Sequence, residues 1–204
     1  MNQTQSGPTQ TYGRTIGRIL ILQLLFMVFT IVGLGVFGFF PALLAVMAVV
    51  RQYKRETDDA PIHKMFWRYY KELFLKGNLV CLPFLAAYAG LIILIQHFQQ
   101  IGLNQYGIYA CYFVALFLLI FWIYGLPALV HLNMNLAHFI RGTLLISMIR
   151  AVHTVGIAFI IIAVGWIGIN VSPIVAVLLI STAAYWWISI ALHAFLGFVS
   201  EPEE

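Results

Sequence analysis

Apolar positions along this chain gather into long runs, and short polar segments separate one run from the next. Several runs exceed the ~18 consecutive apolar residues that mark a membrane-spanning helix. The pattern predicts an all-α fold, a polytopic transmembrane helix bundle of about six spans, with five as the alternative. The expected spans cover about residues 16–34, 38–53, 79–98, 106–130, 151–169 and 171–198.

The first apolar run, from Ile19 to Val50, is too long for one crossing. As one straight helix it would measure about 48 Å at ~1.5 Å per residue, against a hydrocarbon core of ~30 Å. A natural break lies inside it, because glycine loosens a helix and proline suits the first turn of a new one. We therefore expect two short crossings, and a single tilted span that continues into an interfacial helix is the alternative. The break residues are Gly33, Gly35, Gly38 and Pro41.

Composition agrees with a lipid environment. Of the 204 residues, 62% are hydrophobic and 9% are charged, with a mean hydropathy of +0.94. A soluble domain carries about 25% charged residues, so an ordinary soluble fold is excluded. We expect one transmembrane domain over residues 16–199, between a disordered polar tail at 1–15 and an acidic tail at 200–204.

The placement of the eleven Lys and Arg residues predicts the orientation. None of them lies between Lys76 and Arg141. With six spans all eleven face one side, which the positive-inside rule assigns to the cytoplasm, together with both termini. Four tryptophans near span ends either anchor the membrane interface or pack between helices. These are Trp122, Trp166, Trp186 and Trp187.

Residues 62–77 have the pattern of a basic amphipathic cytoplasmic helix. Phe66, Tyr69, Tyr70, Leu73 and Phe74 follow one helical face, and charged residues follow the other. Such a helix rests in the lipid headgroup layer, where each Lys or Arg contributes about 1 kcal/mol near an anionic surface. Lipid anchoring and docking of a partner are both open, and they are compatible. The candidate contact residues are Arg68, Lys71, Lys76, Trp67 and Tyr70.

A second polar group lies after the fourth expected span. His131, Asn135 and His138 follow one helical face. They either face the cytoplasm or line a cavity or subunit contact, and a metal site is disfavoured because carboxylates and thiols are missing nearby. The candidate polar cavity comprises Asn78, His131, Asn135, His138 and His153.

The sequence lacks the residues that several classes of function require. No Asp or Glu occurs between Glu72 and Glu201, whereas proton- and sodium-coupled carriers usually keep a carboxylate inside the membrane. The segment Gly33–Gly38 matches a dinucleotide-binding fingerprint, but membrane spans flank it instead of a strand and a helix. The sequence predicts no enzymatic activity, cofactor, metal or nucleic-acid partner.

A short internal repeat is visible. Phe40–Leu44 and Leu126–Val130 both contain Pro-Ala-Leu, and each leads from an apolar run into a basic segment. The repeat predicts a unit of span, amphipathic helix and span that occurs twice. A chance match of so few residues is the alternative.

The arrangement of a glycine-rich break, Phe40-Pro41-Ala42, Ala48–Arg51, Phe66–Lys71 and Lys76-Gly77-Asn78 resembles the YesL-like family of bacterial integral membrane proteins, a domain of unknown function. The resemblance is best over about residues 16–95 and extends more loosely over the whole chain. Members often carry a threonine-rich stretch near the proline, which the segment Leu43–Val46 lacks.

The resemblance implies a multi-pass protein of the bacterial cytoplasmic membrane, with genes often beside carbohydrate importers of the ATP-driven class. We expect an accessory or regulatory partner of such an importer. A self-contained transporter or channel for a neutral solute, as a homo-oligomer, is the second hypothesis. A membrane enzyme or lipid-handling protein is the third. The solute path would be lined by Asn78, Gln96, His131, Asn135 and Asn170.

Overall fold

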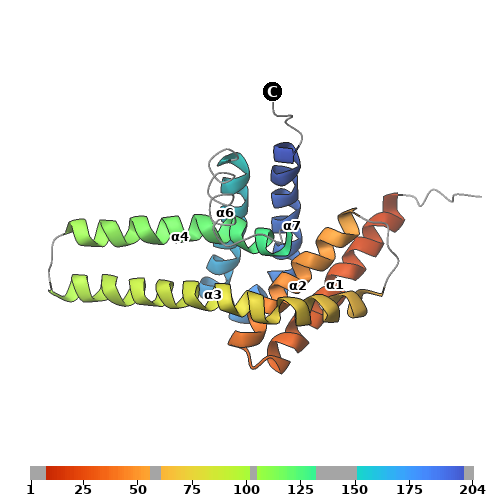
Figure 1. Cartoon of the computed structure of the whole chain (residues 1–204), viewed down its shortest axis with the longest axis horizontal. Helices are drawn as coiled ribbons and strands as arrows, with labels where there is room; N and C mark the ends of the chain where they lie inside the picture. Colours follow the sequence, from red (N-terminus) through yellow and green to blue (C-terminus); the bar gives the residue numbers. More distant parts are fainter. Residues whose placement is uncertain (1–7, 56–60, 102–104, 132–150, 200–204) are drawn as a thin grey trace, which may run out of the picture.

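The structure is a computed structural model that describes residues 8–55, 61–101, 105–131 and 151–199 (Figure 1). Its elements within these ranges are helices, and no strand occurs among them, which confirms the predicted all-α class. The helices are α1 (Pro8–Val32), α2 (Val36–Arg55), α3 (Ile62–Ile101), α4 (Gln105–His131), α6 (Ala151–Asn170) and α7 (Pro173–Val199).

Five of these helices are long and apolar enough to cross a membrane. A further apolar stretch, Gln105–Leu119, lies in α4, so the choice between five and six spans among the described helices depends on whether α4 also crosses the membrane. The chain is a multi-pass helical membrane protein. The five stretches are Thr15–Val32, Val36–Lys54, Ile62–Ile101, His153–Asn170 and Ile174–Leu192.

The first apolar run is two helices, as predicted. The chain reverses at Gly33–Gly35, where Leu34 has a φ of 62° and Gly35 a φ of 71°. The prediction that Pro41 lies in the first turn of the second helix was wrong, because Pro41 lies further inside α2. Gly38 also lies inside α2.

Two further boundaries differ from the sequence prediction. The expected tail at 1–15 is helical from Pro8 onward, because proline suits a first helical turn and the apolar span extends the helix that it begins. The amphipathic helix at 62–77 and the span at 79–98 form one helix of 40 residues, α3. The expected acidic tail at 200–204 lies outside the described residues.

The glycine and asparagine in the middle of α3 do not end that helix, because they pack on α2. Gly77 and Asn78 are both buried, and a Cβ atom on Gly77 would lie 2.8 Å from the Cδ1 atom of Leu44. A pair that resembles a helix break in the sequence is thus a point of close contact between two helices.

The helix α2 is the centre of the molecule. Its residues from Ala42 to Val50 are between 0% and 7% exposed. It packs against α1, α3, α4 and α7. The core of the protein is therefore built around α2.

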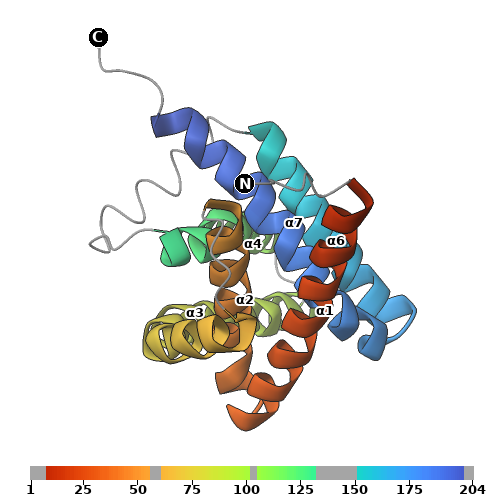
Figure 2. The same ribbon diagram turned by 90° about the vertical axis from the view of Figure 1, so that its right-hand side faces the viewer.

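Beyond α1 and α2, the other four helices form two pairs that run crosswise to each other. Figure 1 shows α3 and α4 as a long hairpin, which Figure 2 views end-on, whereas α6 and α7 pair along a different direction. The hairpin exposes apolar side chains such as Ile93 and Phe113, at 66% and 71%. Of the four tryptophans, Trp166 and Trp186 are exposed like interface anchors, and Trp187 is buried between helices.

Candidate functional site

The turn between α1 and α2 brings two glycines into backbone contact. A Cβ atom on Gly33 would lie 2.4 Å from the Cα atom of Gly38 and 2.5 Å from the hydroxyl oxygen of Tyr70. That hydroxyl donates a hydrogen bond to the backbone carbonyl of Phe29, with 3.1 Å between the oxygens. Only a hydrogen atom fits at Gly33, so α1, α2 and α3 meet there without an intervening side chain.

Asn78 bonds a carbonyl group that Pro41 leaves without its helical partner. In a regular helix the carbonyl of Phe37 would accept a bond from the N–H of residue 41, and proline has no N–H. The side-chain amide of Asn78 on α3 donates to this carbonyl, with 2.9 Å between nitrogen and oxygen. The bond satisfies a part-buried backbone group and ties α2 to α3.

Pro127 in α4 creates the same need, and Trp187 meets it. The proline leaves the carbonyl of Ile123 without an N–H donor from its own helix. The indole N–H of Trp187 on α7 donates to that carbonyl at 2.8 Å, in a buried position. The repeat seen in the sequence thus marks two interior prolines whose freed carbonyls are bonded by side chains of other helices.

An apolar cavity of about 260 Å³ lies beside Trp187, between α2, α4, α6 and α7. The indole nitrogen of Trp122, which also lines it, is buried and has no hydrogen-bond partner among the described residues. These four helices therefore do not fill the space between them completely at this point. The other lining residues are Phe39, Leu43, Leu126, Ile160, Ile161, Val164, Ile180, Ala183 and Ala184.

Gln23 joins α1 to α7 through two backbone groups. Its amide nitrogen donates to the carbonyl of Val177 at 2.8 Å, and its amide oxygen accepts from the N–H of Ser181 at 3.0 Å. A carbonyl and an N–H four residues apart normally pair with each other in a helix. The buried amide therefore bonds both members of one such pair on α7.

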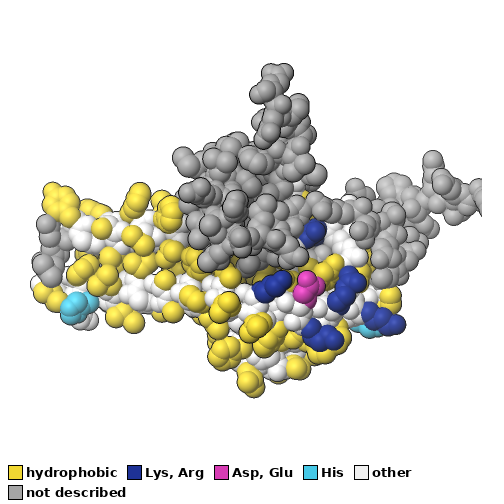
Figure 3. All heavy atoms as spheres, viewed as in Figure 1, with side chains coloured by type: hydrophobic (Ala, Val, Ile, Leu, Met, Phe, Trp, Pro, Cys, Tyr) yellow, Lys and Arg dark blue, Asp and Glu magenta, His cyan; other side chains and the backbone are white. Residues whose placement is uncertain are grey.

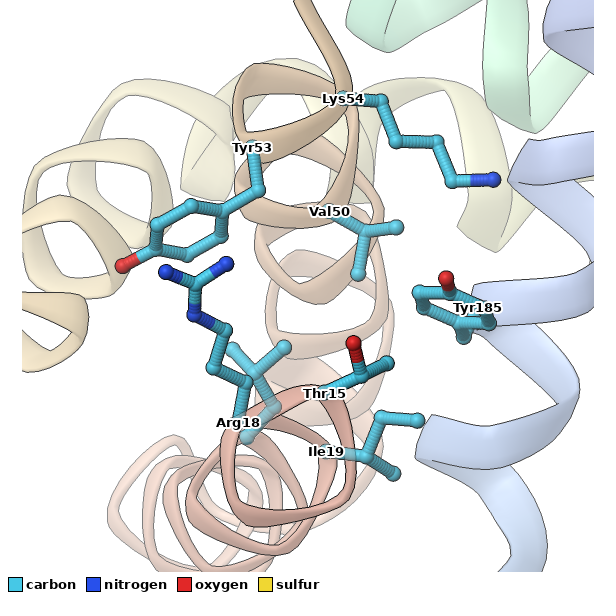
Figure 4. Close-up of a pocket in the computed structure, with 8 residues that line it drawn as sticks. Thr15, Arg18, Ile19, Val50, Tyr53, Lys54 and Tyr185 are labelled. Atoms are coloured by element: carbon cyan, nitrogen blue, oxygen red, sulfur yellow. The ribbon is translucent and has the colours of Figure 1, made fainter. Parts of the chain in front are cut away.

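A basic pocket of about 120 Å³ lies between α1, α2 and α7 (Figure 4). The guanidinium carbon of Arg18 lies 4.2 Å from the centre of the Tyr53 ring, and the Lys54 ammonium lies 4.9 Å from the centre of the Tyr185 ring. Lys54 also donates to the hydroxyl of Ser189 on α7. The complete lining is Thr15, Arg18, Ile19, Leu22, Val50, Tyr53, Lys54 and Tyr185.

A second basic surface follows the exposed side of the first half of α3. Figure 3 shows Lys and Arg side chains gathered at this end of the molecule, away from the far end of the α3–α4 hairpin. The Lys71 ammonium lies 5.0 Å from the centre of the Trp67 ring, and Trp67 is 45% exposed. Arg68 donates to the side-chain oxygen of Gln52 at 3.3 Å. We call Trp67, Arg68, Lys71 and Lys76 the α3 basic face.

Comparison with known proteins identifies relatives of this chain. A family model described as "Protein of unknown function, DUF624" matches residues 19–96. The protein YesV of Bacillus subtilis (strain 168), described as uncharacterized, is 30% identical over 142 residues, which cover 67% of each chain. The chain belongs to the DUF624 family.

Two further DUF624-type relatives come from the same organism, and both are also described only as uncharacterized proteins. YteU is 32% identical over 144 residues, covering 65% of this chain and 60% of YteU. YesL is 25% identical over 156 residues, covering 74% of this chain and 70% of YesL. The chain thus spans less than two thirds of the length of YteU. No solved structure matches the chain.

The DUF624 match covers the segment that forms the contact between α1, α2 and α3. It includes the Gly33–Gly38 approach, Pro41 and the residues Tyr70 and Asn78 that bond backbone carbonyls. The resemblance to the YesL-like family, which the sequence indicated on similar residues, is therefore confirmed.

The predicted sites have different outcomes in this DUF624 protein. Arg68, Lys71, Lys76 and Trp67 are exposed on α3, as a contact surface requires, but Tyr70 is buried against α1 and is not part of that surface. In the expected polar cavity, Asn78 is bonded to α2, and His153 is a half-buried residue of α6. The side chain of His131 and the residues Asn135 and His138 lie outside the described part.

The basic pocket and Gln23 were missed in the sequence. Arg18 and Tyr53 lie at almost equal distances along the chain from the turn at Gly35, so an antiparallel pair of helices brings them together. The predicted break at 33–38 therefore contained the signal for the pocket. Gln23 is the one amide in the apolar run 19–32, and this was the signal that could have found it. Its partners on α7 are backbone groups, which the sequence pattern does not reveal.

Proposed function

We propose that this protein is an accessory or regulatory subunit of an ATP-driven carbohydrate importer in the bacterial cytoplasmic membrane, and that it acts by binding instead of catalysis. The resemblance to the YesL-like family supports the choice of importer. The α3 basic face supports the binding role, and it is the observation on which the proposal rests.

The α3 basic face has the composition of a protein contact surface. Trp67 is exposed with Lys71 over its ring, and Arg68 is held beside Tyr69, with 5.0 Å from its guanidinium carbon to the ring centre. Tryptophan, tyrosine and arginine are enriched among the residues that carry binding energy at protein interfaces. The contacts with neighbouring side chains hold the exposed groups in place before a partner arrives, which lowers the entropy lost on binding.

The polar side chains proposed for a solute path favour the accessory role over independent transport. The Asn78 amide bonds the backbone of α2, and the Asn170 amide donates to the carbonyl of Trp166 on its own helix at 3.0 Å. The Asn78 amide thus serves the packing of α3 on α2, and the Asn170 amide bonds its own helix. Purified protein in liposomes is expected to show no solute uptake.

The proposal places the α3 basic face and both termini in the cytoplasm, in agreement with the positive-inside rule. A Thr4→Cys variant tests this orientation in whole cells with a membrane-impermeant thiol reagent. The native cysteines, Cys81 and Cys111, are buried and give little background. Labelling of the new cysteine from outside the cell would contradict the orientation.

The decisive experiment is purification of the tagged protein in a gentle detergent at native expression, with mass spectrometry of the proteins that accompany it. We expect importer subunits in a fixed ratio. Recovery of the protein alone would contradict the proposal.

Two variants with the same change in net charge localise the contact. R68Q with K71Q alters the α3 basic face, and Q99E with Q100E alters exposed residues at the other end of α3. We expect the first pair to lose the importer subunits and the second to retain them. Equal recovery with both pairs would exclude the α3 basic face as the contact.

A further inference from the structure

The basic pocket between α1, α2 and α7 combines two cations in one small cavity. Arg18 comes from α1 and Lys54 from α2, and the cavity of about 120 Å³ also has Tyr185 of α7 on its wall (Figure 4). Among the described lining residues there is no carboxylate to neutralise either cation. The two charges lie on different sides of the pocket, with Arg18 beside Tyr53 and Lys54 beside Tyr185 (Figure 4). Two positive charges on the walls of one pocket favour an anion between them.

The contacts of both cations leave hydrogen-bond donors for such an anion. The ring of Tyr53 meets the face of the Arg18 guanidinium, whereas the five N–H donors of arginine lie in the plane of that group. The bond from Lys54 to Ser189 uses one of the three N–H donors of the ammonium. Planar arginine donors match the oxygens of a phosphate in particular.

The pocket also lies at the depth where a membrane holds phosphate. Thr15 begins the apolar stretch of α1, and Lys54 ends that of α2. Residues at the ends of spans lie near the headgroups, whose phosphates attract Lys and Arg. A free phosphate compound in the adjoining water would present the same chemical group.

We propose that the basic pocket binds a phosphate group through Arg18 and Lys54. The ligand is the phosphate of a lipid headgroup or of a small water-soluble compound. This site is separate from the α3 basic face, so its test does not depend on the proposed importer contact.

The test measures the thermal unfolding midpoint of the delipidated full-length protein in a neutral detergent, with three probes. The probes are phosphatidylglycerol in mixed micelles, phosphatidylcholine in mixed micelles and inorganic phosphate, with chloride at equal ionic strength as the reference. We expect stabilisation by phosphatidylglycerol if the source is a lipid, and by inorganic phosphate if the source is soluble. Stabilisation by phosphatidylcholine as well would show that the phosphate, and not the net charge of the lipid, is recognised.

Matched variants assign the effect to the pocket. R18Q and K54Q each remove one pocket cation, and Q99E and Q100E each lower the net charge by the same amount at the other end of α3. We expect about a tenfold weaker apparent affinity for the effective probe in each pocket variant, because one charge-assisted hydrogen bond is lost. The Q99E and Q100E variants should bind as the natural chain does. An unstabilised natural chain, or pocket variants that respond as it does, would overturn the proposal.

A charge-conserving variant covers the case in which R18Q does not fold. R18K keeps the positive charge but has no planar pair of donors. We expect several-fold weaker binding of the effective probe, and an unchanged affinity would overturn the role of Arg18.

Discussion

The two prolines of the internal repeat lie in unlike surroundings. Pro41 in α2 is enclosed by α1, α3, α4 and α7, and Asn78 of the next helix bonds the carbonyl that it frees. Trp187 of the last described helix bonds the carbonyl that Pro127 in α4 frees, and Trp187 itself lines an apolar cavity. The same three residues, Pro-Ala-Leu, thus occur with different donors, and the second donor lies beside open space.

The comparison shows that each of these two interior prolines constrains a helix other than its own. Each leaves one carbonyl without its helical donor, and a second helix places an N–H donor opposite it. A partner that fits the backbone closely, as α3 fits α2, leaves little space. A large indole reaching from α7 leaves room beside it. The first region should therefore tolerate change less well than the second.

The largest difference is expected for added methyl groups at glycine. G33A would place a Cβ atom 2.4 Å from the backbone of Gly38, so the α1–α2 turn must shift. We expect a loss of about 3 kcal/mol in the free energy of unfolding. The control G156A in α6 meets only the Cδ1 atom of Ile190, at 3.9 Å, and should lose little. Circular dichroism during unfolding in detergent mixtures measures both, and equal losses would contradict the contrast.

Removal of the Asn78 amide should have the next largest effect. N78L leaves the part-buried carbonyl of Phe37 without a donor, which costs about 2 kcal/mol. P41A restores a backbone N–H to α2, so the double variant P41A with N78L should recover most of the loss. A double-mutant cycle with the two single variants measures this coupling. Additive effects would show that Asn78 does not compensate for the proline.

The equivalent change in the second region should cost less. W187F removes the donor to the Ile123 carbonyl, but the cavity alongside gives neighbouring groups room to adjust, so we expect a loss of about 1 kcal/mol. P127A should again reduce the loss in the double variant. The same unfolding assay applies, and a loss as large as that of N78L would remove the distinction between the two regions.

The smallest effect should come from methyl groups added at Ala183. A183V extends into the 260 Å³ cavity and should stabilise the protein by about 0.5 kcal/mol. A45V adds the same atoms to a fully buried position of α2 and should destabilise it by about 1 kcal/mol or more. Opposite signs in the unfolding assay would confirm the difference in packing, and equal signs would refute it.

Most of the helix pattern was predictable, because it depends on hydropathy and on local breaks. The turn at Gly33–Gly35 follows from the length of the first apolar run, and the later helices begin and end near the residues expected. The continuity of α3 was not predictable in the same way. Gly77 and Asn78 carry the signature of a break, and only the contact with α2 explains why the helix continues.

The candidate site was predictable only where the relevant groups are side chains on one helix. The exposed residues Arg68 and Lys71 followed from the amphipathic pattern of residues 62–77. Tyr70 shares that segment, but its partner is a backbone carbonyl of α1 that no pattern reveals. The pairing of Arg18 with Lys54 needed the hairpin geometry, which the sequence indicated only indirectly.

The two bonded carbonyls also bear on how the chain is made. Asn78 comes 41 residues after Phe37, and Trp187 comes 64 residues after Ile123. A ribosome therefore completes α2 and α4 well before it produces the donor that each requires. A span released into lipid at that moment would expose a carbonyl without a partner, at a cost of several kcal/mol. During biosynthesis α2 avoids this cost if it stays at the insertion machinery until α3 is made. For the same reason α4 has to stay there until α7 is made.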